Sequence, residues 1–542
     1  MFSLLGPLLV LGLLLASSLY VAPFSVRVLG RVVGWYLRLK TRDRRSQILA
    51  RVRADEERYR ETRGTDDHPE DDDWEAIEAY AAGTAANGEK AGAEWEGIVG
   101  FFHPFCNAGG GGERVLWAAI RATQKRWPKA VCVVYTGDHD VDKATILARV
   151  ENRFNIHLHP PTVVFLYPST RRYVLSSTYP HFTLLGQSMG SVVLALDAFS
   201  LLPPDIFIDT MGYAFAIALS SLFFPAVPTG AYVHYPTIST DMLTSLGEDG
   251  LGVNAGSGRG WRGLAKRQYW EMFARMYSWA GGNVDVVMTN SSWTQAHIRA
   301  LWGPGRARRG PALDVEVVFP PVAVEELAQQ IDVSPASEKQ RERTILYIAQ
   351  FRPEKNHTLV LEAFSKLLQA HPTLATTKLV LVGSVRHSDD STRVYKLRLL
   401  AHELHIKERV EFICDASWSE ILDWLRRSWI GVNGMWNEHF GIGVVEYQAA
   451  GLISVVHDSG GPKGDIVVDY DGGPTGFHAT TAEEYAAAFA TVLSMAPDET
   501  LAMRRRARAS AQRFTEDAFA TRWIAQMERL ITLQVDGRRR RG

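Results

Sequence analysis

The chain has 542 residues, which at about 150 residues per domain is enough for three or four domains, or for two large domains with additional segments. Hydrophobic residues make up 46% of the chain and charged residues 22%, a composition that excludes collagenous, disulfide-scaffold and globally disordered proteins. The 59 Lys and Arg nearly balance the 60 Asp and Glu, so the net charge of −1 provides no overall basic field, and no nucleic-acid partner is expected.

The first predicted element is a membrane anchor over residues 1–26. No charged side chain occurs from Met1 to Val26, and a helix of this length can cross a hydrocarbon core of about 30 Å. Seven Lys and Arg against one acid follow before residue 46, which by the positive-inside rule places the body of the protein in the cytosol. The alternative is a cleaved secretory signal with Leu8–Ala16 as its apolar region, although no basic segment precedes it.

A basic juxtamembrane segment and an acidic linker are predicted over residues 27–95. Seven acids and no Lys or Arg lie between Asp66 and Glu75, next to the Ala- and Gly-rich run Ala81–Ala93, which is typical of a solvated linker. A second apolar stretch, Met211–Val227, fits either a buried helix or a helix with one face in the bilayer surface.

Short, nearly unbroken apolar runs alternate with helical stretches in two series after the linker, as is typical of parallel strands buried on both faces. The predicted strands are 97–103, 130–135, 162–167, 205–209, 230–235 and 284–289, then 344–351, 378–382, 409–414, 430–434 and 453–457. They predict two doubly wound, Rossmann-like α/β domains at 96–335 and 336–514 that face each other across a cleft, with a ligand on each wall. Residues 515–542 are predicted to form a last helix, able to pack on either domain, and a basic tail.

A glycine-rich turn follows the first predicted strand and opens a helix. Glycines let the backbone approach a phosphate closely, and the helix N-terminus offers free N–H groups and a partial positive charge. We therefore predict that Gly110, Gly111 and Gly112 bind a diphosphate; the alternative is a turn that needs glycine only for its conformation. Arg114 stands where GxGxxG requires glycine, and no Gly-Lys-Ser/Thr follows, so a dinucleotide-binding dehydrogenase and a P-loop NTPase are disfavoured.

Two cations lie where the first strand of the second series ends, in the turn from Gln350 to His357. Arg352 can hold a nucleotide diphosphate with a fork of donors, and Lys355 can hold it as a point charge. The same pattern also fits an exposed turn in which Glu354 and Lys355 only cap the next helix.

Two acids eight positions apart, Glu438 and Glu446, bracket the start of a helix predicted near residues 442–450. A helical rise of about 12 Å would be too long for the pair to flank one glycosidic bond, as the carboxylates of a retaining hydrolase do at about 5 Å. The pair suits the two ends of an elongated donor, with Glu438 at a sugar and Glu446 at a ribose. The N–H groups expected to face the phosphates belong to Phe440, Gly441 and Ile442. Two unrelated surface acids are the alternative, but an idle Glu446 among apolar neighbours would be costly to bury.

These motifs resemble those of retaining glycosyltransferases of family 4. Glu438 to Glu446 matches the E-x7-E pattern of that family, and Pro353 to Asn356 resembles its Pro-Glu-Lys-Gly turn. Four longer stretches resemble a narrower group, the eukaryotic endoplasmic-reticulum α-1,2-mannosyltransferases that extend the dolichol-linked oligosaccharide of N-glycosylation. They are HPFCNAGGGGERVLW (103–117), VHYPTIS (233–239), MTNSSWT (288–294) and GMWNEHFGIGVVE (434–446).

The resemblance covers about residues 97–531 and implies the two-domain GT-B fold. It implies GDP-mannose as the donor, a dolichol-diphosphate oligosaccharide as the acceptor, the cytosolic face of the endoplasmic-reticulum membrane as the location, and other dolichol-pathway mannosyltransferases as partners. It also implies a sugar role for Glu438, a ribose role for Glu446 and a diphosphate role for Lys355. His234 matches a histidine that contacts the donor sugar. The family's usual Gly-Arg pair falls on Ala349-Gln350, so Arg352 is left to supply the second cation.

An α-linked donor and an α-1,2 product imply a reaction with retention, which we interpret as front-face displacement with charge on the leaving diphosphate stabilised by fixed cations. No metal and no other cofactor are expected. The acidic run Asp138–Asp142 is predicted to cap a helix, and the three cysteines form no CxxC pair. A family-4 enzyme with another nucleotide sugar, such as UDP-N-acetylglucosamine, and a catalytically silent membrane scaffold remain as alternatives.

Overall fold

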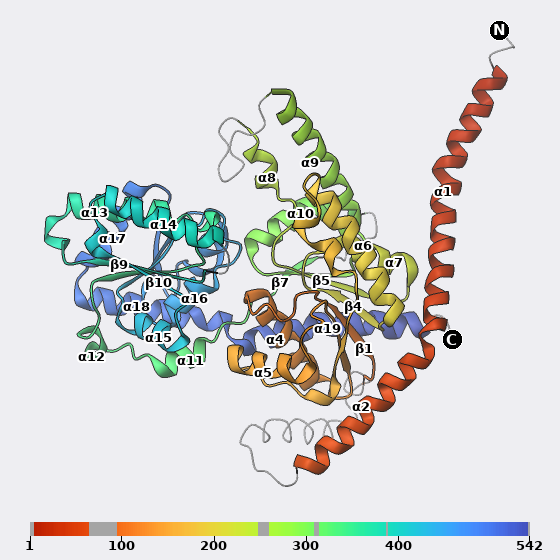
Figure 1. Ribbon diagram of the computed structural model, residues 1–542, viewed down its shortest axis with the longest axis horizontal. Helices are drawn as coiled ribbons and strands as arrows, with labels where there is room; N and C mark the ends of the chain where they lie inside the picture. The colour runs from red at the N-terminus through yellow and green to blue at the C-terminus, as the bar shows by residue number, and fades with distance from the viewer. Residues whose placement is uncertain (1–4, 64–94, 248–259, 308–313, 386–387, 540–542) are drawn as a thin grey trace.

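The computed structural model describes residues 5–63, 95–247, 260–307, 314–385 and 388–539. These residues form two lobes, each built on a parallel sheet covered by helices (Figure 1). The predicted acidic and Ala-rich linker lies outside the described residues.

The N-terminal lobe contains a parallel sheet with the order β3-β2-β1-β4-β5-β6-β7. Its strands are β1 (Ile98–Phe102), β2 (Val131–Tyr135), β3 (Val163–Leu166), β4 (Ile206–Asp209), β5 (Thr229–Val233), β6 (Val286–Thr289) and β7 (Val315–Val317). Its helices are α1 (Leu5–Lys40), α2 (Arg42–Arg63), α4 (Gly111–Arg126), α5 (Lys143–Phe154), α6 (Thr183–Leu201), α7 (Ala214–Phe223), α8 (Thr240–Ser245), α9 (Gly260–Gly281) and α10 (Ser292–Arg306). The winding direction reverses between β1 and β4, where sheets of this kind bind ligands.

The C-terminal lobe contains a second parallel sheet with the order β10-β9-β8-β11-β12-β13. Its strands are β8 (Thr344–Ile348), β9 (Lys378–Gly383), β10 (Val410–Cys414), β11 (Ile430–Asn433), β12 (Ile453–His457) and β13 (Gly476–Ala479). Its helices are α11 (Val324–Gln330), α12 (Pro335–Glu338), α13 (His357–Ala370), α14 (Ser388–Glu403), α15 (Trp418–Arg427), α16 (Ile442–Ala449), α17 (Ala482–Ser494) and α18 (Pro497–Ala511). Here the reversal lies between β8 and β11.

The chain passes from the first lobe to the second after β7 and returns with its last helix. Val324 and Leu327 of α11 pack in the C-terminal core, so the predicted boundary at residue 335 lies beyond the crossover. The last helix, α19 (Glu516–Arg539), runs back to the N-terminal lobe beside α4 (Figure 1). There Trp523 is fully buried and stacks on Phe101. The sequence left open which domain the last helix packs on, and the structure shows that it packs on the N-terminal one.

All eleven predicted strands occur in the structure, with ends that differ by a few residues. The pattern missed β7 and β13, each of which forms one of the two edges of its sheet. β7 is only three residues long and carries Glu316, and β13 contains Gly476 and His478, so neither is an apolar run. Edge strands bury less surface than central ones, and their sequences are correspondingly less apolar.

The apolar stretch 211–227 forms α7, which is a buried helix packed against α1, α6 and α9. Of the two predicted possibilities for this stretch, a buried helix or a helix with one face in the bilayer surface, the structure shows the buried helix. Among the described residues searched, α6 is long and apolar enough to cross a membrane, and 39% of its most apolar window is buried.

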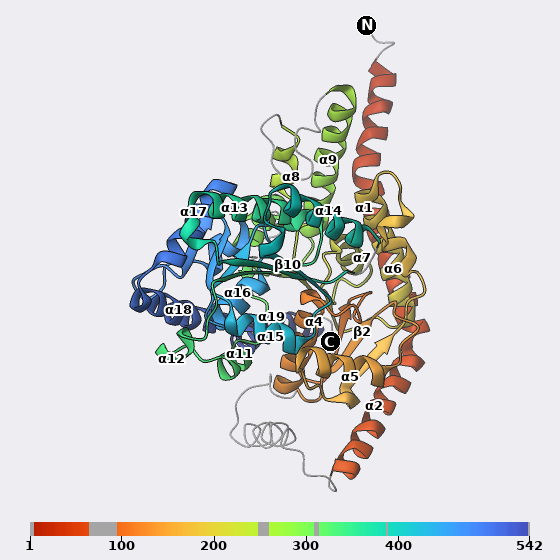
Figure 2. The same cartoon turned by 60° about the vertical axis from the view of Figure 1, so that its left-hand side comes forward.

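Helix α1 runs without interruption from Leu5 to Lys40, so the predicted anchor and the start of the basic segment share one helix. The lower part of α1 packs on α7, and Arg45 of α2 pairs with Asp205 at 2.6 Å. Figures 1 and 2 show the N-terminal part of α1 projecting away from the lobe.

Candidate functional site

A cavity of about 270 Å³ lies between the lobes, where both sheets reverse their winding. The N-terminal lobe contributes Gly111, Gly112, His234, Asn290 and Pro320. The C-terminal lobe contributes Ile348, Ala349, Lys355, Asn433, Glu438, His439, Phe440, Gly441, Ile442, Gly443 and Tyr447. Most of the predicted site residues therefore meet in one place.

A larger cavity of about 910 Å³ adjoins the first and shares Gly111 and Ile442 with it. Its remaining lining includes Gly110, Arg114 and Glu446, the apolar side chains Ile421 and Trp418 of α15, and the polar side chains Arg149, Asn152 and Arg153 of α5. The two cavities together form an elongated site, with Glu438 in one part and Glu446 in the other.

The glycine-rich turn is held by its own helix. Gly110 is the N-cap residue of α4, and the carboxylate of Glu113 accepts a hydrogen bond from the Gly110 N–H. The other carboxylate oxygen of Glu113 lies 3.5 Å from Nε2 of the buried His103. This arrangement fixes the turn while the first N–H groups of the helix remain free of intrahelical partners.

Gly111 lies directly against the opposite lobe. A Cβ atom at this position would come within 2.6 Å of Cδ1 of Ile442, the first residue of α16. A Cβ at Gly112 would lie 3.6 Å from Nε2 of His234, which is an ordinary contact. The N-termini of α4 and α16 thus approach each other across the cleft, and both have a partial positive charge.

His234 follows β5 and lines the smaller cavity. Its Nε2 atom is buried and has no hydrogen-bond partner among the described residues. Burial, together with the nearby His103, lowers the pKa of His234 to about 4. The ring is therefore neutral at pH 7, and its Nε2 can donate a hydrogen bond to a hydroxyl group in the cavity or accept one from it, according to the tautomer.

Lys355 and Glu438 form an ion pair at the floor of the smaller cavity. Nζ of Lys355 lies 2.5 Å from Oε2 of Glu438, and Asn433 donates to the same oxygen at 3.4 Å. Burial alone would raise the pKa of Glu438, but the charge and hydrogen bond of Lys355 outweigh it and hold the pKa below its usual value. Glu438 is accordingly an ionised acceptor for hydroxyl groups.

The loop that carries Glu438 is held in place by glycines. The Gly461 N–H donates to the Glu438 carbonyl at 2.8 Å, and a Cβ at Gly460 would lie 2.3 Å from that same oxygen. Gly441, the N-cap of α16, has φ of +106°, a conformation that favours glycine. Phe440 packs between Phe319 and Phe514, which anchors the loop.

Glu446 lies in the second turn of α16 and lines the larger cavity. No hydrogen bond to its carboxylate occurs within the described part of the chain. Burial raises its pKa to about 7, and Arg114 opposes that shift. A partly buried carboxylate without a partner is suited to accept hydrogen bonds from a ligand.

The structure places Arg352 differently from the other predicted residues. Arg352 is the N-cap of the short turn Pro353–Lys355, and it lines neither cavity. Among the cations that do line the larger cavity is Arg114, which pairs with Glu516 at 2.7 Å. Arg114 lies within the glycine-rich motif, but in the sequence it was noticed only as a mismatch to GxGxxG.

Contacts across the cleft hold the two lobes together. The rings of Tyr235 and His439 stack with centroids 4.0 Å apart, and Nδ2 of Asn437 donates to Oδ2 of Asp241 at 2.6 Å. These residues lie beside Glu438, so the closure of the lobes and the position of Glu438 are linked.

The acidic run 138–142 has structural partners. Asp142 caps α5 by accepting from the Thr145 N–H at 2.8 Å, as predicted. Asp138 accepts from the Asn107 N–H at 3.1 Å and pairs with Arg171, which holds the loop before the glycine-rich turn.

Sequence comparisons divide the chain into two matched regions. Residues 96–302 match the family described as "ALG11 mannosyltransferase N-terminus", and residues 329–513 match "Glycosyl transferases group 1". A protein of Neurospora crassa named GDP-Man:Man(3)GlcNAc(2)-PP-Dol alpha-1,2-mannosyltransferase is 62% identical over 98% of this chain and 96% of its own length. The mouse protein of the same name is 45% identical over 83% of this chain and 89% of its own.

Solved structures share the fold at low sequence identity. A trehalose-phosphate synthase from Burkholderia xenovorans has a TM-score of 0.57 at 14% identity, covering 81% of this chain and 100% of its own. Anabaena HepE in complex with UDP and glucose has a TM-score of 0.50 at 15% identity, covering 79% of this chain and 99% of its own. The predicted two-lobed GT-B fold is confirmed.

Proposed function

Because this chain belongs to the family of GDP-Man:Man(3)GlcNAc(2)-PP-Dol alpha-1,2-mannosyltransferases, we propose that its interlobe site transfers mannose from GDP-mannose to a dolichol-diphosphate oligosaccharide in N-glycan precursor synthesis. One observation carries the assignment of the site. Lys355, Glu438, His234 and the glycine-rich turn line a single cavity, and Glu446 lines the cavity next to it.

The donor lies along both cavities. The diphosphate lies against the N-terminus of α4 at Gly111 and Gly112 and against Lys355, where N–H groups and a cation meet negative charge. The mannose lies in the smaller cavity, with hydroxyl groups bound by Glu438 and His234. The ribose hydroxyls are bound by Glu446.

The guanine base extends into the larger cavity beside Trp418 and Ile421 of α15. These side chains offer apolar surface to a planar ring, and the opposite wall offers polar side chains of α5. A donor in this position has its base and its sugar at opposite ends of the site, as the spacing of Glu446 and Glu438 requires.

The reaction proceeds with retention by front-face displacement. The bond between C1 of mannose and the β-phosphate oxygen breaks, and a bond from C1 to the acceptor hydroxyl oxygen forms on the same face. The hydroxyl proton passes to the departing diphosphate, so the products are the extended oligosaccharide and GDP. Lys355 and the helix N–H groups stabilise the charge that develops on the leaving group, which is the part that a divalent ion has in other transferases. Arg352 can add a second cation only if the turn Pro353–Lys355 moves towards the cavity.

The membrane location rests on α1. Its uncharged N-terminal segment, followed by Arg27 and Arg31, fits a single-pass anchor in the endoplasmic-reticulum membrane with the lobes in the cytosol. The sequence Asn-Ser-Ser at 290–292 would be a potential N-glycosylation site if the lobes were in the lumen. Asn290 is buried, and its Oδ1 accepts hydrogen bonds from Ser291 and Thr294. Protease treatment of sealed microsomes is expected to digest the lobes, and protection of the lobes would contradict the orientation.

The activity is tested with the full-length protein in lipid nanodiscs. We expect transfer from GDP-mannose and no transfer from UDP-N-acetylglucosamine, with GDP but not UDP competing. The Glu438→Ala variant is expected to lose transfer and to keep the melting temperature within a few degrees. Wild-type protein that is inactive with every nucleotide sugar would favour a silent scaffold.

A further inference from the structure

Most of the exposed large apolar side chains of the described residues lie on one side of the N-terminal lobe, on α1, α6 and α9. They are Phe24, Val26, Val28, Leu29, Val32, Trp35, Tyr36 and Leu39 of α1, Phe182 beside α6, Met189, Val193 and Leu196 of α6, and Trp261, Leu264, Met272 and Trp279 of α9. Apolar area of this extent on a soluble surface marks an interaction site.

Helix α9 has apolar side chains on two opposite faces, one buried and one exposed. Trp261 and Trp279 are 18 residues apart, which is about five turns, so they lie on the same face as Leu264 and Met272. The opposite face buries Trp270, Phe273 and Tyr277 against the core. The outer stripe is accompanied by Arg262, Arg275 and Arg267, of which Arg267 pairs with Glu271 at 2.9 Å, whereas Lys266 lies over the ring of the buried Trp270. Tryptophan and leucine with flanking cations are typical of helices that lie in a membrane interface.

Helix α6 presents a second stripe with no charge. No Asp, Glu, Lys or Arg occurs from Thr183 to Leu196, and Met189, Val193 and Leu196 recur at helical spacing on its exposed face. Phe182 contacts the Tyr269 ring of α9, with ring centroids 5.1 Å apart. The start of the α6 stripe therefore adjoins α9 at Tyr269, where the Leu185 N–H also donates to the Tyr269 hydroxyl at 3.0 Å.

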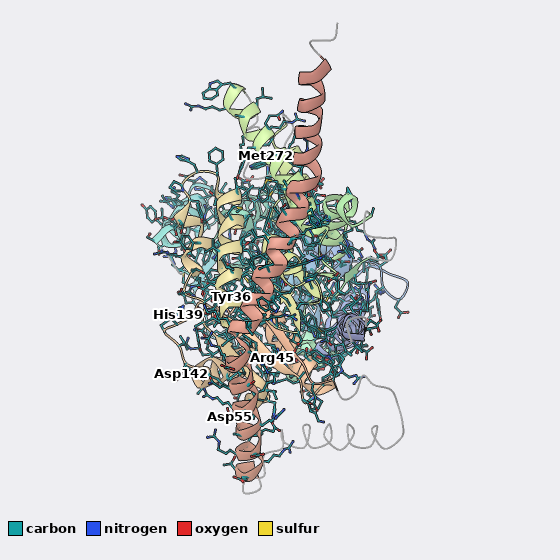
Figure 3. The ribbon with its side chains drawn as sticks, turned by 90° about the vertical axis from the view of Figure 1, so that its right-hand side faces the viewer. Tyr36, Arg45, Asp55, His139, Asp142 and Met272 are labelled. Atoms are coloured by element: carbon teal, nitrogen blue, oxygen red, sulfur yellow. The ribbon has the colours of Figure 1, made fainter. Side chains whose placement is uncertain are left out.

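Helix α1 is fixed to the same surface. Its inner side fits closely on α7, where a Cβ at Gly34 would collide with the Phe223 carbonyl oxygen, while Trp35 and Tyr36 remain exposed. Helix α7 packs against α1, α6 and α9 alike. Figures 1 and 2 show α1 and α9 projecting from the same end of the lobe, and Figure 3 shows Met272 and Tyr36 on the side that α1 crosses.

We propose that α6 and the projecting half of α9 enter the interface of the same bilayer that α1 spans. The N-terminal lobe then lies directly on an anionic lipid surface and is not attached to the membrane by α1 alone. Continuity with α1 identifies the occupant as lipid. Arg262 and Arg275 beside the α9 stripe match lipid phosphates, whereas a protein partner would have to bury them. This proposal rests on the membrane anchor given under the proposed function. The contact of α6 and α9 with lipid can nevertheless be measured without any enzymatic turnover.

The contact can be tested with a fluorescent probe in full-length protein in nanodiscs of phosphatidylcholine and phosphatidylserine. Cys106 and Cys132 are buried and Cys414 is exposed, so a Cys414→Ser background leaves no exposed thiol in the described residues. Bimane is attached to Leu264→Cys, to Val193→Cys, or to Tyr395→Cys on α14 of the other lobe, which is 63% exposed and serves as the control.

Lipids brominated on their acyl chains are expected to quench the probes at 264 and 193 several-fold more than the probe at 395. Equal quenching at the three positions would overturn the proposal. Protection from aqueous iodide without quenching by brominated lipid would also overturn it, because a protein or a second copy would then cover this face.

A functional measurement separates membrane contact from catalysis. A Trp261→Ser/Leu264→Ser variant is expected to transfer mannose to the dolichol-linked acceptor in nanodiscs about tenfold more slowly, and to a short-chain, water-soluble acceptor at the wild-type rate. Equal loss with both acceptors would contradict the membrane role. Failure of wild-type transfer would count against the proposed function and leave the quenching result unaffected.

Discussion

Nζ of Lys355 lies 2.5 Å from Oε2 of Glu438, so the residue predicted to bind the diphosphate and the residue predicted to bind the sugar form an ion pair with each other. Their motifs are separated by more than eighty residues in the chain, and the reversal of the sheet between β8 and β11 brings them together.

The two partners are expected to differ in their effect on stability and on turnover. Lys355→Met leaves a largely buried carboxylate unpaired, so it should lower the melting temperature more than Glu438→Gln does. Both variants should lose at least about 100-fold in kcat, because each removes a group that acts on the transition state. Thermal melts and single-turnover assays of both variants check this.

The double variant Lys355→Met/Glu438→Gln provides the control. It should melt above Lys355→Met alone, with a coupling of about 1–3 kcal/mol, because it leaves no unpaired charge. Additive effects on stability would show that the two groups are not coupled.

Gly111 and Gly112 are expected to respond differently to the same substitution. Gly111→Ala places a methyl group 2.6 Å from Cδ1 of Ile442, so the end of the Ile442 side chain must shift at the edge of the cavity, and the KM for GDP-mannose should rise severalfold. Gly112→Ala meets only an ordinary contact with His234 and should change the KM less. Shortening the clashing side chain in Gly111→Ala/Ile442→Ala should restore part of the affinity, and no restoration would contradict the steric explanation.

Transfer is expected to continue at the wild-type rate in EDTA. Lys355 and the N–H groups at the start of α4 already supply positive charge to the diphosphate, and two acids of the run 138–142 are engaged, Asp142 in a helix cap and Asp138 in an ion pair with Arg171. Initial rates with EDTA, Mg²⁺ and Mn²⁺ decide the matter, and strict dependence on Mn²⁺ would overturn the mechanism.

Much of the fold was predictable because buried parallel strands are apolar runs, and all eleven predicted strands occur. The two acids were predictable because their spacing is local to one loop and helix. Arg114 was not recognised, because its place beside Glu446 depends on how the two lobes close and not on any pattern within its own motif. The α6–α9 surface was missed for the same reason, since sequence alone does not say which face of an apolar helix stays exposed.

The pKa of Glu446 predicts how donor binding depends on pH. Burial raises this pKa to about 7, and the ionised carboxylate accepts hydrogen bonds from the ribose hydroxyls more strongly than the protonated acid does. The affinity for GDP-mannose should therefore fall as pH drops below 7, by up to about tenfold per pH unit. Calorimetric titrations from pH 5.5 to 8.5 measure this, because the pyrophosphate diester of the donor does not titrate in that range.

The Glu446→Gln variant separates this acid from all others. Its affinity should be lower than that of the wild type at pH 8 and nearly constant with pH. The contribution of Glu446 to stability depends on pH in the opposite direction. A carboxyl group whose pKa is higher in the folded than in the unfolded protein stabilises the fold at low pH. That stabilisation is lost as pH rises from about 4.5 to about 7. When both proteins are measured without GDP-mannose, Glu446→Gln should therefore have a higher melting temperature than the wild type at pH 8. This difference in melting temperature should shrink towards pH 5.5. A wild-type affinity that stays flat with pH, together with equal melting temperatures at pH 8, would show that Glu446 is not the ribose ligand.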